Sequence, residues 1–269
     1  MDLGLVSKVF IVTGGARGIG EAIIRALCRE GAIAIVADKE VEKSWDLVQE
    51  LRDEGSEIDA VIGELAEAEN CRKIVAFTLN KYGRIDGLVN NAGRNDQIGL
   101  EHGSPDEFMN SIRSNLLHYY SMAYFALDAL KKSEGNIVNI SSKTAITGQG
   151  NTSAYAAGKG GQLALTREWA VELSKYGIRV NAIVPAEVMT PLYREWIGTF
   201  ERPEEKLQHI NEKIPLGNRM TKAEEIAHMA IFLLSNKSTH ITGQHIFVDG
   251  GYVHLDRAMN VLSNGKVKT

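Results

Sequence analysis

Seven short apolar runs alternate along the chain with longer amphipathic stretches. The runs are rich in β-branched residues, as buried strands are, and the stretches between them have helical spacing. Strands that alternate with helices pair in parallel through right-handed crossovers, so the pattern predicts a single-domain doubly wound α/β fold, with a seven-stranded parallel sheet and helices on both faces. The expected strands are 8–13, 33–37, 58–63, 87–90, 136–141, 179–184 and 245–248, and the main expected helices are 19–29, 41–54, 68–81, 105–131, 153–176 and 223–234.

A glycine-rich turn joins the first expected strand to the first expected helix. Gly14, Gly18 and Gly20 lie there, where glycine lets backbone amides and the helix N-terminus approach a pyrophosphate. Asp38 ends the second strand, about twenty residues beyond the turn, where an acidic group can accept hydrogen bonds from an adenosine ribose. The alternative is an ordinary tight strand-to-helix connection with a surface aspartate. The combination favours a Rossmann-type dinucleotide site.

A second pattern lies near the middle of the chain. Tyr155 and Lys159 are four residues apart on an expected helix, so the phenol and the ammonium share one face. A lysine cation beside a phenol favours the phenolate. Ser142 lies thirteen residues before the tyrosine and follows an apolar run, which places its hydroxyl at the carboxyl end of a strand. Together with the glycine turn, these residues indicate proton transfer next to a dinucleotide.

The glycine spacing resembles the TGxxxGxG motif of short-chain dehydrogenases/reductases. Asn90-Asn91-Ala92-Gly93, Asn115, Ser142, Tyr155 with Lys159, Pro185 and Thr190 match further motifs in order, over about residues 6 to 255. Three positions depart from the family pattern: Gly158 replaces a serine, Ala186 a glycine and Glu64 an aspartate.

The resemblance implies a role for each catalytic residue. Tyr155 is the acid/base, and Lys159 lowers its pKa and bonds the nicotinamide ribose. Ser142 holds the reacting oxygen, and the backbone of Asn115 holds a proton-relay water near the lysine. The alternative for Asn115 is an ordinary amide side chain on the surface of a helix. The implied cofactor-binding residues are Gly14, Arg17, Gly18, Ile19, Gly20, Asp38, Lys39, Glu64, Leu65, Asn91, Ala92, Gly93, Tyr155, Lys159, Pro185, Val188 and Thr190.

The expected cofactor is NAD. Asp38 would repel the 2′-phosphate of NADP while it bonds a 2′-hydroxyl, and Lys39 next to it would offset this only in part. Arg17 could approach a 2′-phosphate, but beside Asp38 we interpret it as a phosphate-side or surface cation. Glu64 has a solvated surface charge as its alternative interpretation.

Three stretches, 142–151, 183–196 and 249–257, resemble bacterial L-fucose dehydrogenases, which oxidise the anomeric carbon of L-fucose and related aldoses to a lactone. The resemblance implies a small-molecule sugar substrate. The long interruption at about 189–216, between the sixth and seventh expected strands, predicts an amphipathic insertion that forms a substrate lid, with routine surface packing as the alternative. The alternatives are a 3-oxoacyl-thioester reductase or other secondary-alcohol dehydrogenase of the family, and a cofactor-sensing protein without turnover. Each polar candidate also has loop surface as an alternative. The candidate substrate residues are Arg94, Ser142, Lys143, Gln149, Asn151, Tyr155, Glu187 and Trp196.

Composition narrows the class of protein. A net charge of −4 and a pI near 6.0 argue against a nucleic-acid partner, and no apolar stretch is long enough for a membrane helix. The N-terminus lacks the regions of a signal peptide, and Cys28 and Cys71 lie in helical patterns typical of buried thiols, so we expect a cytoplasmic protein. The seven histidines have no metal-ligand spacing, and no metal site is expected.

The sequence also leads to expectations about the subunit assembly and the limits of the domain. The family resemblance implies a homotetramer, with Ala123, Ala126, Ala129 and the helix from Ser153 suited to packing between subunits. One domain is expected over residues 1–257, with a tail at 258–269.

Overall fold

The computed structural model describes residues 2–255 and contains one seven-stranded sheet in the order β3-β2-β1-β4-β5-β6-β7. Every pair of neighbouring strands is parallel, as the sequence predicts. The strand order reverses between β1 and β4, and the carboxyl ends of strands at such a switch point are where open α/β sheets bind ligands. The strands are β1 Val9–Thr13, β2 Ile33–Asp38, β3 Ile58–Ile62, β4 Gly87–Asn90, β5 Asn136–Ile140, β6 Arg179–Pro185 and β7 His245–Val248.

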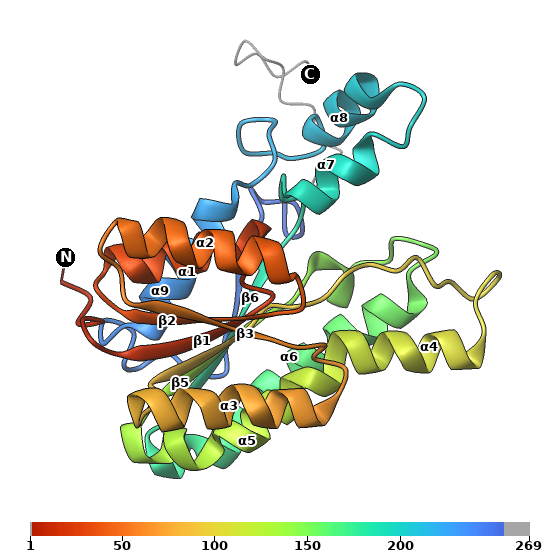
Figure 1. Cartoon of the computed structure of the whole chain (residues 1–269). Coiled ribbons are helices and arrows are strands. Elements are labelled where there is room, and N and C mark those ends of the chain that lie inside the picture. Colours follow the sequence, from red (N-terminus) through yellow and green to blue (C-terminus); the bar gives the residue numbers. More distant parts are fainter. Residues whose placement is uncertain (1, 256–269) are drawn as a thin grey trace.

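Helices cover both faces of the sheet (Figure 1). One layer consists of α1 (Gly18–Arg29), α2 (Val41–Asp53) and α9 (Ala223–Leu234). The opposite layer consists of α3 (Ala68–Tyr82), α5 (His118–Ser133) and α6 (Ser153–Leu173).

Two predicted helices differ in detail from the observed ones. The helix expected over 105–131 is α4 (Pro105–Ile112), a π-helical turn (Arg113–Leu117) and α5 in succession. The helix expected over 153–176 ends in a 3-10 turn, Ser174–Tyr176. A π-helical turn inside an α-helix often marks a functional site, and this one carries Asn115.

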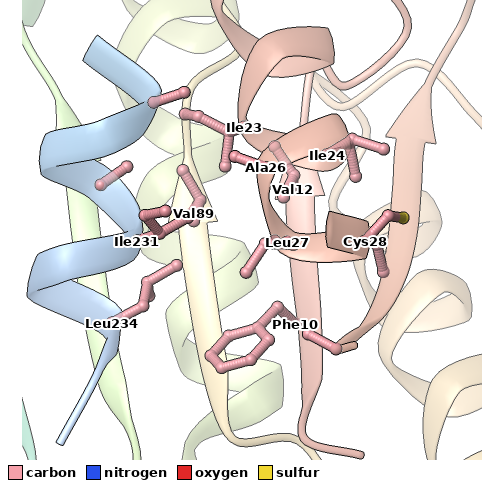
Figure 2. Close-up of a cluster of buried hydrophobic side chains, with 14 of the residues drawn as sticks. Phe10, Val12, Ile23, Ile24, Ala26, Leu27, Cys28, Val89, Ile231 and Leu234 are labelled. Carbon is pink, nitrogen blue, oxygen red and sulfur yellow. The ribbon is translucent and has the colours of Figure 1, made fainter. Parts of the chain in front are cut away.

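The core is built from strand residues that point alternately to the two layers. Phe10 and Val12 of β1 belong to the core cluster that α1 and α9 cover. Figure 2 shows Leu27 of α1 beside Phe10, and Ile231 of α9 beside Val89 of β4. Val9 and Ile11 point to the other layer. A strand buried on both faces reads as an unbroken apolar run, which is why β1 could be located without periodicity. Burying each large side chain of this kind contributes roughly 1.5–3 kcal/mol.

A separate helical segment follows the carboxyl end of β6. It contains α7 (Pro191–Ile197) and α8 (Pro203–Asn211), which stand away from the two helical layers at the top of Figure 1. Ile197 is the buried residue of α7, and α8 buries none of its residues. The segment coincides with the interval 189–216 that the sequence marks as an insertion.

The structure corrects one expectation about assembly. Ala123, Ala126 and Ala129 lie buried in the chain's own core on the α5 side of the sheet, so they are not a surface for another subunit. The outward side of this region instead exposes Tyr120, Tyr124 and, on α6, Val171. Spacing of small residues cannot distinguish packing within a chain from packing between chains.

Other expectations concern the thiols, the membrane and the tail. Cys28 and Cys71 are free and buried, as predicted. Over residues 2–255, no helix has the length and apolarity to cross a membrane. The expected tail at 258–269 lies outside the described residues.

Candidate active site

The structure brings Ser142, Tyr155 and Lys159 together at the carboxyl end of β5. Ser142 is the second residue after the strand, and α6 supplies the other two side chains. Lys159 Nζ lies 5.5 Å from the centre of the Tyr155 ring. Ser141 Oγ donates a 3.0 Å hydrogen bond to the Lys159 carbonyl, which fixes this turn of α6 to the strand end. The face predicted from the four-residue spacing therefore points into the site.

Lys159 is buried and held by three oxygen atoms. Its Nζ donates to the Ile140 carbonyl at 2.8 Å, to Gln162 Oε1 at 3.3 Å and to Tyr119 Oη at 3.4 Å. Burial disfavours the charged ammonium and lowers the pKa of Lys159 to about 7. The lysine can therefore change charge in the neutral range.

Burial is the main influence on the pKa of Tyr155. Burial raises the pKa of Tyr155 to about 12, while its hydrogen bond with Ser142 acts in the opposite direction. The negative charges of Asp96 and Glu187 raise it further. The pKa of Tyr155 therefore moves in the direction opposite to the lowering that the sequence predicts from Lys159, because removing a phenolate from water is unfavourable.

Asn115 is fully buried in the π-helical turn, so it is not the surface amide of the alternative interpretation. Its side chain accepts a 2.9 Å hydrogen bond from the backbone N–H of Arg94 and donates to Ser111 Oγ at 3.2 Å. Its main-chain carbonyl accepts a 2.6 Å hydrogen bond from Gln162 Nε2. The residue therefore links α4, the loop after β4 and α6.

The glycine turn has the close packing that a pyrophosphate cradle requires. Gly14 and Gly18 adopt positive φ values of 63° and 62°. A Cβ on Gly20 would lie 2.0 Å from the Gly14 carbonyl oxygen, so no larger residue fits there. Asn91 Nδ2 donates to the carbonyls of Thr13 and Gly14 at 2.9 and 3.1 Å, which ties the loop after β4 to the turn.

The rest of this loop and turn also adjoins the cradle. The backbone N–H of Ala92 donates to Thr13 Oγ1 at 3.1 Å. Gly93 has a φ of 154°, and a Cβ there would lie 2.9 Å from Asn115 Oδ1. Ile19 is half-buried in the first turn of α1. These residues bring backbone, rather than bulky side chains, to the switch point of the sheet.

Asp38 ends β2 with its carboxylate buried and held by the backbone. Oδ2 accepts a 3.0 Å hydrogen bond from the Ala16 N–H, and Oδ1 accepts from Lys39 and Glu40 at 2.7 and 3.1 Å. A carboxylate offers about four lone-pair sites, so three backbone donors leave room for one hydroxyl donor. The position and the remaining capacity fit an adenosine ribose.

The cations near Asp38 are paired with carboxylates. Lys39 Nζ donates to Glu64 Oε2 at 3.0 Å, which lowers the pKa of Glu64 against the opposing effect of burial. Arg17 lies 3.9 Å from carboxylate oxygens of both Glu40 and Glu195. Leu65, the neighbour of Glu64, is buried after β3.

The loop after β6 lies against the glycine turn. Pro185 is the last residue of β6, and Val188 is buried and bridges to Thr221. Thr190 caps α7, because its Oγ1 accepts from the Tyr193 N–H at 3.2 Å. A Cβ on Gly18 would lie 3.4 Å from Thr190, so this loop meets the glycine turn.

Two of the candidate substrate residues form an ion pair whose side chains are 9% and 13% exposed. Lys143 Nζ contacts Glu187 Oε1 directly, although the two residues are 44 positions apart. The lysine also lies 4.1 Å from the centre of the Tyr252 ring, and Tyr193 hydrogen-bonds Glu187. Because Glu187 also acts on the pKa of Tyr155, this polar cluster adjoins the acid/base residue.

The other candidate substrate residues are more peripheral. Arg94, Gln149 and Asn151 are exposed, and Asn151 adopts a left-handed φ of 51°. Trp196 is half-buried between Tyr193 and Phe200, with ring centres at 5.1 and 4.9 Å. The structure does not bring the first three into the polar cluster, and their roles stay predictions.

Three residues of this site were not identified from the sequence. Asp96 Oδ1 is buried and, among the described residues, has no hydrogen-bond partner. Tyr119 lies four residues after Asn115, and Gln162 lies three after Lys159. Residues three or four positions apart share a helix face, so Tyr119 lies on the face of Asn115 and Gln162 on the face of Lys159. The helical spacing in the sequence could therefore have identified both. Within residues 2–255, no group of His, Cys, Asp or Glu side chains is arranged to hold a metal ion.

Known proteins are similar to this chain over most of its length. A family model described as enoyl-(acyl carrier protein) reductase matches residues 14–253. The L-fucose dehydrogenase of Mus musculus is 38% identical over 91% of this chain and 88% of its own length. The 3-oxoacyl-[acyl-carrier-protein] reductase FabG of Thermotoga maritima is 35% identical over 93% and 99%. The crystal structure of Cj0485 dehydrogenase superposes with a TM-score of 0.93, at 47% identity, covering 97% of this chain and 99% of that one.

These matches agree with the motifs and with the arrangement of Ser142, Tyr155 and Lys159. Members of this family typically bind a nicotinamide cofactor. The chain belongs to the short-chain dehydrogenase/reductase family of oxidoreductases.

Proposed function

We propose that the protein is an NAD-dependent aldose 1-dehydrogenase, which oxidises the anomeric hydroxyl of L-fucose or a related aldose to the lactone. The observation that carries the proposal is the polar cluster beside Tyr155. Lys143 and Glu187 form an ion pair that is largely shielded from water, and Asp96 has a buried carboxylate oxygen with no hydrogen-bond partner among the described residues. The charges of Glu187 and Asp96 act on Tyr155 from different loops. Buried polar groups of this kind favour a substrate with several hydroxyls and penalise an apolar one.

The proposed mechanism assigns one task to each side chain. A nicotinamide bound at the glycine turn would accept the hydride from the anomeric carbon. Tyr155, as the phenolate, takes the proton of the anomeric hydroxyl, and loss of that proton together with the hydride would turn the C–O bond into the lactone carbonyl. Ser142 donates a hydrogen bond to the reacting oxygen and steadies its charge. Lys159, while it is protonated, favours the phenolate, and it would bond the nicotinamide ribose.

Sugar recognition is proposed for the cluster around Tyr155. Asp96 and Glu187 provide anionic acceptors for ring hydroxyls, and Lys143 provides a donor. Trp196, within the aromatic row of α7, is positioned to cover an apolar sugar face or the C6 methyl group. We also propose that α7 and α8 act as a lid over this cluster, because they follow β6 directly and bury few residues.

A screen of substrates tests the proposal. NAD reduction is measured with L-fucose, D-arabinose, L-galactose, D-glucose and simple secondary alcohols, and NADPH oxidation with a 3-oxoacyl thioester. We expect the highest kcat/KM with L-fucose. Asp96→Asn, which removes one anionic acceptor, should raise KM for L-fucose about tenfold and leave the affinity for NAD unchanged. Turnover of the thioester or of an alcohol, with no activity on any sugar, would overturn the assignment.

NAD preference is proposed from the charges around Asp38. A 2′-phosphate would meet the Asp38 carboxylate, and Lys39 is already paired with Glu64. We expect kcat/KM to be about 10²-fold higher with NAD than with NADP, since like charges in contact cost several kcal/mol. Asp38→Asn should lower the NAD-to-NADP ratio, because it removes the charge that repels the 2′-phosphate. Glu64→Gln should lower the ratio less, because it only releases Lys39 to attract that phosphate.

The control for the cofactor prediction is Asp46→Asn. This variant makes the same charge change at an exposed position of α2 and should leave the ratio unaltered. Equal or better use of NADP by the wild-type enzyme would show the inference about Asp38 to be wrong.

A cytoplasmic homotetramer remains the proposed state of the enzyme. The two buried free thiols suit a reducing compartment. Tyr120, Tyr124 and Val171 are large side chains exposed by 51%, 61% and 77% on neighbouring helices, and they replace the buried alanines as the proposed contact surface between subunits. Light scattering is expected to give the mass of four chains, and a monomer would contradict the proposal.

A further inference from the structure

Gln162 occupies an unusual position between two parts of the site. It lies on α6, three residues after Lys159, and it is completely buried. Its Oε1 accepts a hydrogen bond from Lys159 Nζ at 3.3 Å, and its Nε2 donates to the Asn115 carbonyl at 2.6 Å. Both functional groups of the amide are therefore used, one on the catalytic lysine and the other on the π-helical turn.

The same carbonyl is the one that the family resemblance assigns to a relay water. A water in that place must be captured and can exchange, whereas an amide is attached to the helix and has a donor at one end and an acceptor at the other. An amide also fixes direction: its oxygen can only accept from the ammonium, and its nitrogen can only donate to the carbonyl.

We propose that Gln162 is a positioning residue for the reaction, whose side-chain amide holds the ammonium of Lys159 against the main chain of Asn115 in place of a water. The inference rests on the roles that the proposed function gives to Tyr155 and Lys159. Through Lys159, Gln162 sets where the positive charge lies relative to the phenol.

The titratable groups around Lys159 determine which effects a Gln162 variant would show in an assay. The ammonium also donates to Tyr119 and to Ile140, and the imidazole of His118 lies close enough for the Lys159 charge to act on it. Burial lowers the pKa of His118 to about 3, and it raises that of Tyr119 well above its usual value, so both stay neutral during an assay.

The carboxylates that face the phenol, Asp96 and Glu187, are common to the wild type and to a Gln162 variant. Losing the acceptor on Gln162 removes a partner that favours charged Lys159. The lysine then loses its proton at lower pH, so at neutral pH a smaller fraction of the enzyme carries the positive charge that favours the phenolate.

The test replaces Gln162 by leucine and compares it with Thr166→Val. Thr166 lies one turn further along the same buried face, where its hydroxyl accepts a 2.9 Å hydrogen bond from Asn139 and donates to the Gln162 carbonyl at 2.8 Å. Thr166→Val therefore breaks buried hydrogen bonds on the same helix without touching Lys159. Thermal unfolding of both variants measures the structural cost.

For Gln162→Leu we expect kcat for sugar oxidation to fall about tenfold, and the rise of rate with pH to move to higher pH, with KM for the sugar little changed. Thr166→Val should keep the wild-type kcat and pH profile. A wild-type kcat and pH profile in Gln162→Leu, or the same change in Thr166→Val, would overturn the inference.

Tyr155→Phe separates this inference from the proposed function. If Tyr155→Phe is inactive while Gln162→Leu behaves as wild type, the positioning role alone fails. If Tyr155→Phe keeps full turnover, the proposed function fails as well.

Discussion

Tyr155→Phe is expected to lower kcat about 10³-fold while leaving the affinity for NADH within about twofold of wild type. The change removes the group that takes the proton and almost no volume. Steady-state oxidation of the sugar and fluorescence titration with NADH measure the two quantities. Retention of more than about a tenth of the rate would mean that another residue is the base.

The rate of the wild-type enzyme is also expected to depend on pH. Burial raises the pKa of Tyr155 to about 12, so the phenolate is the minor form at neutral pH. Oxidation needs the phenolate, and its rate should therefore climb as the pH rises toward the alkaline range. A rate that is flat or falls between neutral and alkaline pH would contradict this assignment of the base.

Lys159→Met is expected to damage both chemistry and cofactor binding, by about 10²-fold in kcat and about tenfold in the dissociation constant of NADH. The first loss follows from removing positive charge next to the phenol, and the second from removing a donor for the nicotinamide ribose. An unchanged NADH affinity would exclude the ribose contact. An unchanged kcat would exclude the role in proton transfer.

The same variant has a distinct signature in stability. The pKa of Lys159 is lowered by burial from 10.5 to about 7, so the unfolded chain binds more protons between those two values. In the wild type, the cost of charged, buried Lys159 is fully present below about pH 7 and disappears as the pH rises toward 10.5. The free energy of unfolding of Lys159→Met relative to wild type should therefore be highest at and below neutral pH. Denaturant unfolding at several pH values measures the difference, and a difference independent of pH would contradict the burial argument.

Local patterns in the sequence determined much of the fold. Each of the seven strands is short, apolar and separated by a helical stretch, and a parallel sheet buried on both faces needs such runs. The pattern could not locate the π-helical turn at Arg113–Leu117, because one extra residue in a turn leaves the apolar spacing almost unchanged. It also misplaced the subunit surface, since Ala123, Ala126 and Ala129 pack inside the chain.

The site divides in the same way between sequence and tertiary structure. The sequence by itself determined that Tyr155 and Lys159 share a helix face and that the glycines join a strand to a helix, because both follow from spacing within a few residues. Only the tertiary structure decided that Lys143 meets Glu187 and that Gln162 reaches Asn115. Those partners lie on different elements, 44 and 47 positions apart, and the crossovers of the sheet bring them together. The burial of Tyr155 and Lys159 is likewise seen only in the tertiary structure, and that burial is the main influence on the pKa of each side chain.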